Sequence, residues 1–338
     1  MTLAHAADGG GRPPGPPLRE GRLLAAIEAS SRGLPAHVAI GPGDDMALLQ
    51  VAGGRLLVAV DQVVEGRHFL PGTPPALVGA KAVLRNLSDV AAMAGRPLAC
   101  LAACVLPAGF SEADAALLFE GVRATAAGAG CPLIGGDIAV HAAAAPSAPL
   151  VVSVTILALP RDAGDAAAEA AGPGGGVVRR RSAQAGDVVF VTGVLGGSFG
   201  PDGMGRHLRP QPRVQEALVL AAALGPALHS MLDLSDGLGR DGAHLVDERH
   251  QVVLEASRLP CASGCDWRAA LGDGEDYELC LAVDPRVRPP ERPAGTTLTA
   301  VGRVQLRSAG EPACVVIVDG RTLDATALGW EHRGHAAP

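Results

Sequence analysis

Apolar residues along the chain recur at two spacings, and each spacing predicts a different element. Short apolar runs bounded by Gly, Pro or charged residues predict strands over 48–51, 56–60, 101–106, 150–159, 188–192, 231–234, 252–254, 277–283, 298–301 and 315–318. Apolar positions three and four residues apart predict helices over 19–32, 75–94, 111–127, 214–224 and 238–248. Gly53-Gly54 predicts a hairpin turn between the first two strands. Strands and helices are mixed without regular alternation, which favours an α+β fold.

The composition changes at one place along the chain. Residues 162–176 are rich in Ala and Gly, which is typical of a loop or linker. We therefore predict a disordered lead-in over 1–18, an N-terminal domain over 19–160, a linker loop over 161–178 and a C-terminal α/β domain over 179–338. The lead-in is rich in Gly and Pro and lacks the apolar stretch of a secretory signal.

Overall composition excludes several classes of partner. The 338 residues carry a formal net charge of -7, and 48% of them are apolar but only 2% aromatic. Negative charge gives no general attraction to nucleic acid or anionic lipid, and few aromatic rings exist for stacking on bases. Pro146 and Pro149 interrupt the longest uncharged stretch, so no membrane span is predicted. Seven cysteines, an odd number in a chain this large, favour the reducing cytoplasm.

Acidic residues stand repeatedly at predicted strand ends or in Gly-rich turns. They are Asp44, Asp45, Asp61, Asp137, Asp233, Asp236, Glu275 and Asp276. Asp61 closes the strand 56–60, and Asp137 follows Gly135-Gly136 in a predicted turn. Each acid alone is an ordinary turn residue. If several converge, a cation must offset their repulsion, and carboxylates without paired His or Cys favour Mg²⁺, which suits phosphoryl transfer.

Two basic features accompany the acids. On the helix 75–94, Lys81, Arg85 and Asp89 fall at i, i+4 and i+8 and share one face; such a ladder alone is most often solvated. The arginines at 179–181 either contact phosphate or lie solvated in a loop. The chain has no P-loop and no protein-kinase signature, so a phosphate site would have to be built from these acids and arginines.

Eight motifs then follow one another in order. They are Gly41-Pro42-Gly43-Asp44-Asp45, Asp61 with Glu65-Gly66-Arg67-His68-Phe69, Lys81 with Asn86-Leu87-Ser88-Asp89, Gly135-Gly136-Asp137, Ala185-Gly186-Asp187, Asp233-Leu234-Ser235-Asp236-Gly237, Gly274-Glu275-Asp276-Tyr277-Glu278 and Gly329-Trp330-Glu331-His332. Any one motif is weak, but the ordered series is specific. Through it, residues 20–335 resemble the thiamine-monophosphate kinases, of the superfamily that also holds aminoimidazole ribonucleotide synthetase and selenophosphate synthetase.

The resemblance implies an α+β chain of two α/β domains. The N-terminal mixed-sheet domain would bind metal and nucleotide and pair its sheet with a second subunit, giving a homodimer, and the C-terminal α/β domain would follow it. The implied enzyme transfers the γ-phosphoryl group of its co-substrate ATP in line to thiamine monophosphate, a phosphate-group acceptor, assisted by several Mg²⁺ ions. It would act in the cytoplasm, with no nucleic-acid or membrane partner.

The resemblance also implies roles for individual residues. Metal ligands match Asp45, Asp61, Asp89, Asp137, Asp233 and Asp236, with Asp44 beside them; of these, Asp89, Asp137 and Asp236 match catalytic residues. The ATP site matches Gly136, Asp137, Ser235 and one arginine of 179–181, where we favour Arg180 and leave Arg181 open. His68, Glu275 and Trp330 match contacts to thiamine phosphate. Trp330 is expected as the one stacking residue, Glu275 as acceptor for the aminopyrimidine, and His68 as facing the substrate phosphate.

One departure from the family pattern bears on the metals. Ala59 and Val60 precede Asp61 where the family often has hydroxyl residues, which leaves the number of Mg²⁺ ions open. Two alternatives follow: another ATP-dependent enzyme of the same superfamily, or a catalytically silent nucleotide-binding protein. A selenophosphate synthetase is disfavoured because no cysteine precedes Cys100.

Overall fold

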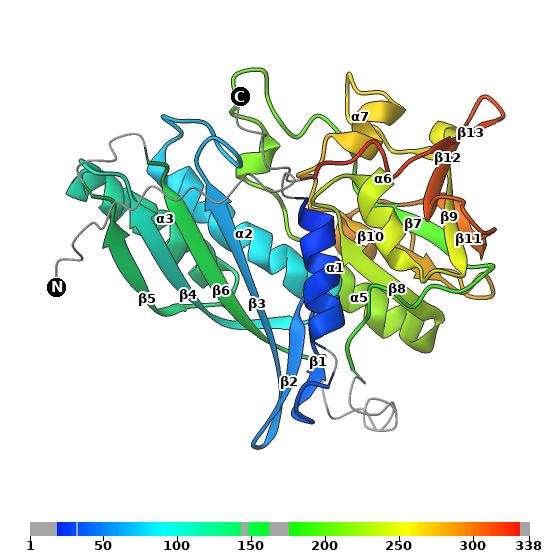
Figure 1. Cartoon of the computed structure of the whole chain (residues 1–338), viewed down its shortest axis with the longest axis horizontal. Helices are drawn as coiled ribbons and strands as arrows, with labels where there is room; N and C mark the ends of the chain where they lie inside the picture. The colour runs from blue at the N-terminus through cyan, green and yellow to red at the C-terminus, as the bar shows by residue number, and fades with distance from the viewer. Residues whose placement is uncertain (1–18, 32, 143–147, 162–175, 332–338) are drawn as a thin grey trace, which may run out of the picture.

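The computed structural model describes residues 19–31, 33–142, 148–161 and 176–331, which form two β-sheets with helices between and around them (Figure 1). The strands of the first sheet all lie within 38–159, and those of the second within 188–324. This architecture confirms the α+β prediction. The predicted lead-in 1–18, residues 162–175 of the predicted linker, and His332 lie outside the described residues.

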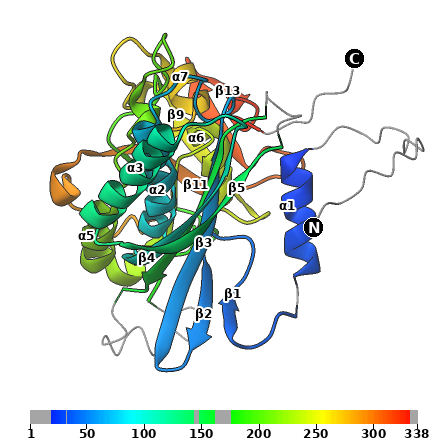
Figure 2. The same ribbon diagram turned by 90° about the vertical axis from the view of Figure 1, so that its left-hand side faces the viewer.

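The first sheet has the strand order β1-β2-β3-β6-β4-β5. Its strands are β1 (Val38–Ile40), β2 (Ala47–Val51), β3 (Gly54–Val64), β4 (Arg96–Leu106), β5 (Leu133–Val140) and β6 (Val151–Leu159). Only β4 and β5 pair in parallel. Helices α2 (Pro75–Ala92) and α3 (Glu112–Gly128) lie on one side of it (Figure 2). Alternate residues such as Val154 and Ile156 are buried under them, whereas Val60 and Leu101 are exposed on the opposite, open face.

The second sheet has the order β13-β12-β9-β11-β7-β10-β8. Its strands are β7 (Val188–Thr192), β8 (Leu228–Asp233), β9 (His250–Glu255), β10 (Leu279–Val283), β11 (Leu298–Leu306), β12 (Cys314–Val318) and β13 (Arg321–Asp324). Helix α5 (Val214–Leu224) covers one face, and α6 (Leu238–Asp241) with α7 (Trp267–Gly272) covers the other. Both faces are therefore buried in apolar clusters.

Helix α2 is the element that the two sheets share. Its residues Val78, Val83 and Leu87 belong to the core under the first sheet, while Ala91 packs with α5 and the second sheet. The helix starts with Pro75 in its first turn, where a missing N–H is harmless. It ends just before Ala94, whose left-handed φ of +52° stops the helical path. A helix predicted from apolar spacing thus lies between both halves of the molecule.

Several local predictions are confirmed. The Gly53-Gly54 hairpin joins β2 and β3, with Val51 opposite Gly54. Ser111 caps α3, its hydroxyl accepting a hydrogen bond from the Asp114 N–H at 3.0 Å. The predicted helix 214–224 coincides with α5, and α1 (Glu20–Ser30) lies within 19–32. Within the described ranges, no helix combines the length and apolar character needed to cross a bilayer.

Other local predictions are wrong. Gly135-Gly136-Asp137 forms no turn but continues β5, because Gly136 crosses the Ala102 carbonyl so closely that a Cβ would overlap it. Asp61 does not close its strand, since β3 pairs with β6 as far as Val64. The helix predicted over 238–248 ends as α6 at Asp241 and continues as a short 3-10 turn. The strand predicted from Tyr277 starts only at Leu279, and β1, β13 and α7 were not predicted.

Candidate active site

Three carboxylates from separate segments meet where α2 lies between the sheets. Asp45 precedes β2, Asp89 lies in the last turns of α2, and Asp233 ends β8. One carboxylate oxygen of each lies within 4.8 Å of one from each of the other two. We call these residues the acidic triad. An all-oxygen donor set of this kind fits a hard divalent cation such as Mg²⁺.

Burial and mutual repulsion shift the protonation of the acidic triad. The pKa of Asp89 lies well above its ordinary value, because the carboxyl is buried and faces Asp61, Asp233 and Asp45. Burial, with the Asp45 charge adding to it, raises the pKa of Asp233 to about 7. Burial also raises the pKa of Asp45, although Arg180 opposes the shift. The negative charge here is only partly compensated, which is the condition that favours a bound cation.

The three consecutive arginines each form an ion pair, but Arg179 and Arg181 remain exposed, and Arg180 is the most buried of the three. Arg180 reaches the acidic triad and pairs with both oxygens of Asp45, its Nε lying 3.3 Å from Oδ2. Arg179 pairs with Asp44, and Arg181 pairs with Glu28 of α1 at 3.2 Å. Of the three, Arg180 is the one that contacts the acidic triad.

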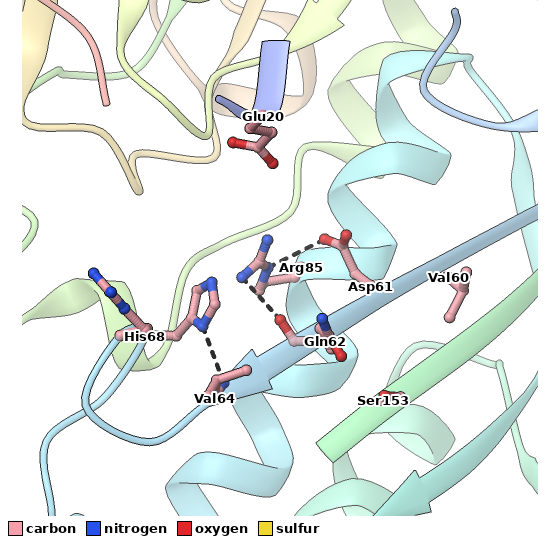
Figure 3. Close-up of a pocket in the computed structure, with 9 residues that line it drawn as sticks. Glu20, Val60, Asp61, Gln62, Val64, His68, Arg85 and Ser153 are labelled. Carbon is pink, nitrogen blue, oxygen red and sulfur yellow. Dashed lines mark hydrogen bonds and ion pairs between the residues drawn. The ribbon is translucent and has the colours of Figure 1, made fainter. Parts of the chain in front are cut away.

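A cavity of about 560 Å³ opens beside the end of β3 (Figure 3). Arg85 of α2 reaches into it and donates from Nε to Asp61 Oδ2 at 3.1 Å and from Nη1 to the Gln62 carbonyl at 3.2 Å. His68 points into the same space, and its Nδ1 accepts the Val64 N–H at 3.0 Å. The neutral imidazole therefore carries its proton on Nε2, where it can donate to an anion.

A second cavity of about 370 Å³ shares Arg67, His68 and Arg85 with the first. Its other walls are Phe199, Ser235, Asp236, Gly272, Asp273, Glu275, Tyr277 and Trp330. Phe199 stacks on His207, with ring centroids 4.2 Å apart. Phe199 and Trp330 are each about half exposed. Together with Tyr277 they are the aromatic side chains that line this cavity, and the expectation that Trp330 is the one stacking residue stays a prediction.

The loop after α7 shapes this second cavity through its backbone. Glu275 and Tyr277 both adopt left-handed φ, +56° and +52°, a conformation that costs non-glycine residues about 1 kcal/mol or more. Between them, Asp276 accepts the Ser198 hydroxyl at 2.6 Å and pairs with Arg206. The Tyr277 hydroxyl is buried with no partner among the described residues, and burial raises its pKa well above the ordinary value. It remains a neutral donor beside the cavity.

A third cavity, of about 330 Å³, lies between α1 and the Gly-rich loop that carries Asp44. Arg180, Arg181, Arg240 and His244 line it, and Asp236 lines both this cavity and the second. Burial, with the nearby arginines adding to it, lowers the pKa of His244 to about 4. Its three guanidinium groups can bind phosphate oxygens, although the carboxylates of Glu20, Glu28, Asp44 and Asp236 line the same cavity.

The structure brings together many of the residues singled out from the sequence, but not all of them. Asp61 faces the acidic triad, and its charge acts on Asp89. Ser235 and Asp236 line the second cavity together with His68, Glu275 and Trp330. Gly136 and Asp137 lie apart from the acidic triad, exposed on the edge strand β5.

Sequence reasoning missed the burial of the ladder on α2. Lys81 is fully buried and pairs with Glu275, and Arg85 pairs with Asp61, so this face of the helix is not solvated. The spacing that ends at Asp89 was the available signal, because it places all three side chains on the face of a proposed metal ligand. Tyr277 stood in the motif Gly274-Glu275-Asp276-Tyr277-Glu278 but was given no role, and Phe199 carried no signal beyond the rarity of aromatic residues in this chain.

The chain is similar in sequence and in structure to known proteins. Residues 43–159 match the family described as AIR synthase related protein, N-terminal domain. The thiamine-monophosphate kinase of Rhodopirellula baltica is 32% identical over 307 residues, covering 84% of this chain and 89% of that protein. The thiamine-monophosphate kinase of Mycobacterium tuberculosis is 31% identical over 346 residues, covering 94% of each. The solved structure of AaThiL complexed with AMPPCP and TMP has a TM-score of 0.73 at 26% identity, covering 93% of this chain and 97% of that one.

Proposed function

The chain belongs to the thiamine-monophosphate kinase family and is an enzyme, and on that premise we propose that it phosphorylates thiamine monophosphate to thiamine diphosphate with ATP. The γ-phosphoryl group passes directly and in line to the acceptor phosphate. The observation that carries the proposal is the position of the acidic triad, next to Arg180 of the third cavity and near Arg85 of the first two. Two ligands bound in these cavities would approach each other at the carboxylates.

We assign the Mg²⁺ ions to the acidic triad, with Asp61 beside it and Asp236 as a further ligand. Asp137, which is exposed on β5 apart from the triad, would serve as a ligand only across the subunit interface proposed below. The raised pKa values of Asp89 and Asp233 support this assignment, since they mark charge that lacks a counter-ion. Bound Mg²⁺ would neutralise charge on the transferring phosphoryl group. The number of ions stays open because of Ala59 and Val60.

For ATP, we assign the phosphates to the third cavity and to Arg180, with Ser235 as a further contact. Gly136, on β5 beside Asp137, would contact ATP only across the subunit interface proposed below. Arg180 is suited to this role because its pairing with Asp45 fixes the guanidinium beside the acidic triad. A planar guanidinium can then bind two phosphate oxygens at once.

For the acceptor, we assign the thiamine rings to the cavity with Trp330 and Phe199, and the phosphate to His68 and Arg85. Glu275 accepts a hydrogen bond from the aminopyrimidine. The acceptor phosphate is already an anion, so the reaction needs no strong general base. The work of this chain is then to hold two phosphate groups in line and away from water.

We further propose a homodimer joined through the open face of the first sheet. Val60 and Leu101 are exposed apolar residues on that face, and Asp137 lies on it opposite Ala103. Pairing two such faces would bury the apolar residues and bring Asp137 into an interface. We propose the cytoplasm as the compartment, supported by seven cysteines that all remain free thiols.

The proposal is tested by product formation from ATP, Mg²⁺ and thiamine monophosphate, with free thiamine as a parallel acceptor. We expect thiamine diphosphate from the monophosphate only. Asp89→Asn should lower kcat by about 100-fold or more while the circular-dichroism spectrum is unchanged, because a triad ligand is lost. Glu120→Gln, which removes an exposed acid of α3, is the matched control and should keep full activity.

Two results would contradict the proposal. ATP binding without any product from thiamine monophosphate would support the silent nucleotide-binding alternative. Full activity of Asp89→Asn would reject the metal assignment while leaving the substrate assignment standing.

A further inference from the structure

Lys81 is the only lysine in the chain, and its side chain is fully buried in the middle of α2. Its ammonium group donates to the Glu275 carboxylate and, at 2.6 Å, to the main-chain carbonyl of His68. Glu275 and His68 are the residues that we assigned to opposite ends of the acceptor. One buried cation therefore contacts two residues that line the second cavity.

Burying an ammonium group costs more free energy of desolvation than burying an apolar side chain of the same size. Removing it from water disfavours its charged form, and burial lowers the pKa of Lys81 to about 8 even though Glu275 opposes the shift. Well-packed apolar side chains often replace buried ion pairs without loss of stability. A role beyond packing is therefore the better explanation for this contact.

The contacts hold both partners in fixed positions. Glu275 is 12% exposed at its side chain, and its N–H donates to the Ser235 carbonyl at 2.7 Å. Lys81 engages the Oε2 oxygen, which leaves Oε1 as the acceptor for a ligand. On the other side, Lys81 fixes the main chain of His68, while Val64 fixes its ring. Lys81 therefore holds the Glu275 carboxylate and the main chain of His68 at a fixed separation.

We propose that Lys81 is a positioning residue that fixes the distance between Glu275 and His68 and so selects an acceptor with an aminopyrimidine at one end and a phosphate at the other. This inference rests on the proposed function and adds to it the origin of acceptor specificity. Lys81 touches neither ATP nor the reacting phosphates in this scheme. Its removal should therefore weaken recognition of the acceptor and leave the chemistry of transfer intact.

The test compares the wild-type protein with Lys81→Met, which keeps an unbranched side chain of similar length and removes its charge. We expect the KM for thiamine monophosphate to rise at least tenfold, while kcat and the KM for ATP stay within about twofold. With oxythiamine monophosphate, the same substitution should raise KM by less than about threefold, because this compound lacks the amino group that would donate a hydrogen bond to Glu275. Arg123→Met, which removes an exposed cation of α3, is the matched control and should behave as wild type.

A second measurement does not depend on the variant folding. Because Lys81 is the only lysine, lysine-selective ¹⁵N labelling of the wild-type protein gives one side-chain signal. Thiamine monophosphate should shift that signal, and ATP alone should not. The inference is overturned if the KM of Lys81→Met for thiamine monophosphate is unchanged, or if its kcat falls while its KM values for thiamine monophosphate and for ATP both rise. It is also overturned if thiamine monophosphate binds without shifting the Lys81 signal. A wild-type protein that forms no thiamine diphosphate would instead reject the proposed function.

Discussion

The three carboxyls of the acidic triad are forced into one buried volume, and in the absence of a cation the folded chain relieves their repulsion by holding protons. The pKa of Asp233 is raised to about 7, and that of Asp89 lies well above its ordinary value. An unfolded chain releases the same protons at much lower pH. Stability of the metal-free protein is therefore linked to pH through these residues.

The sign of this linkage gives a prediction. A carboxyl whose folded pKa is raised binds more protons in the folded state, so its contribution to stability falls as pH rises through about 7, the pKa of Asp233. Mg²⁺ competes with those protons. At 100 times its Kd, Mg²⁺ should add about 3 kcal/mol to the free energy of unfolding. We expect a rise in Tm of about 5 °C at pH 8 and a clearly smaller rise at pH 5.5, measured by scanning calorimetry.

Variants separate this effect from general ion binding. Asp89→Asn should lose most of the Mg²⁺-dependent rise in Tm, whereas Glu120→Gln should keep it. An equal rise in Asp89→Asn and wild type would show that the cation binds elsewhere.

At this scale, part of the site could be predicted from the sequence. Asp45, Asp89 and Asp233 belong to motifs whose residue types point to metal binding, and the fold brings one oxygen of each within 4.8 Å of the others. Phe199 could not be found, because its place in the second cavity depends on how the segment after β7 is held by Asp276 and Arg206. A long-range contact of this kind leaves no pattern in the local sequence.

At the scale of elements, α2 arranges the site along its length. Lys81 contacts His68 and Glu275, which we assigned to the acceptor substrate. Arg85 reaches the first cavity, and Asp89 belongs to the acidic triad. At 1.5 Å per residue, this face of the helix spans about 12 Å. The spacing was readable in the sequence, but its burial was not, because burial depends on two sheets that meet at this helix.

The position of α2 depends on its contact with α3. A Cβ on Gly79 would overlap the Leu118 carbonyl, and one on Gly121 would overlap the Ala76 carbonyl. Each glycine therefore lets the backbone of the other helix approach closely. Pairs of this kind escape pattern analysis, because glycine inside a helix usually lowers helix propensity.

Gly79→Ala should therefore destabilise the protein by about 1–3 kcal/mol, since the added methyl group forces the helices apart. Gly128→Ala is the matched control: it lies at the end of α3, and a Cβ there meets nothing within 4 Å. This control should be neutral or gain up to about 1 kcal/mol from helix propensity. Urea unfolding measures both, and equal stability of the two variants would disprove the close-contact account.

The Gly135-Gly136 pair teaches a related lesson about strands. The pair is typical of a turn, yet here it lies inside β5 beside Ala102. Glycine permits a turn and also permits close approach of two backbones, and the local sequence does not distinguish these uses. The hairpin at Gly53-Gly54 was predicted correctly because alternating apolar strands flank it on both sides.

At the scale of the whole molecule, the two sheets differ in how they are covered. The second sheet is buried on both faces, while the helices of the described residues that pack on the first sheet, α2 and α3, cover one face of it. Leu101 on the open face lies opposite Thr155 of β6 and Gly135 of β5. An open apolar sheet face of this extent is a natural surface for a second copy.

Leu101→Glu should convert the proposed dimer to a monomer, because two carboxylates would face each other across a symmetric interface. Size-exclusion chromatography with light scattering at about 10 μM protein measures the mass. Leu306→Glu changes an exposed leucine of the second sheet and should leave the mass unchanged. A wild-type protein that elutes as a monomer would exclude the dimer directly.

The single buried lysine also makes the chain its own reporter of unfolding. A protease that cleaves only after lysine has one cutting site in the entire sequence, between residues 81 and 82, and that bond lies inside α2. The folded protein presents no accessible loop at this bond, so cutting requires the helix to leave its place between the two sheets. The amount of the fragments 1–81 and 82–338 would then measure how many molecules have unfolded globally. Fluctuations of surface loops would produce no fragments.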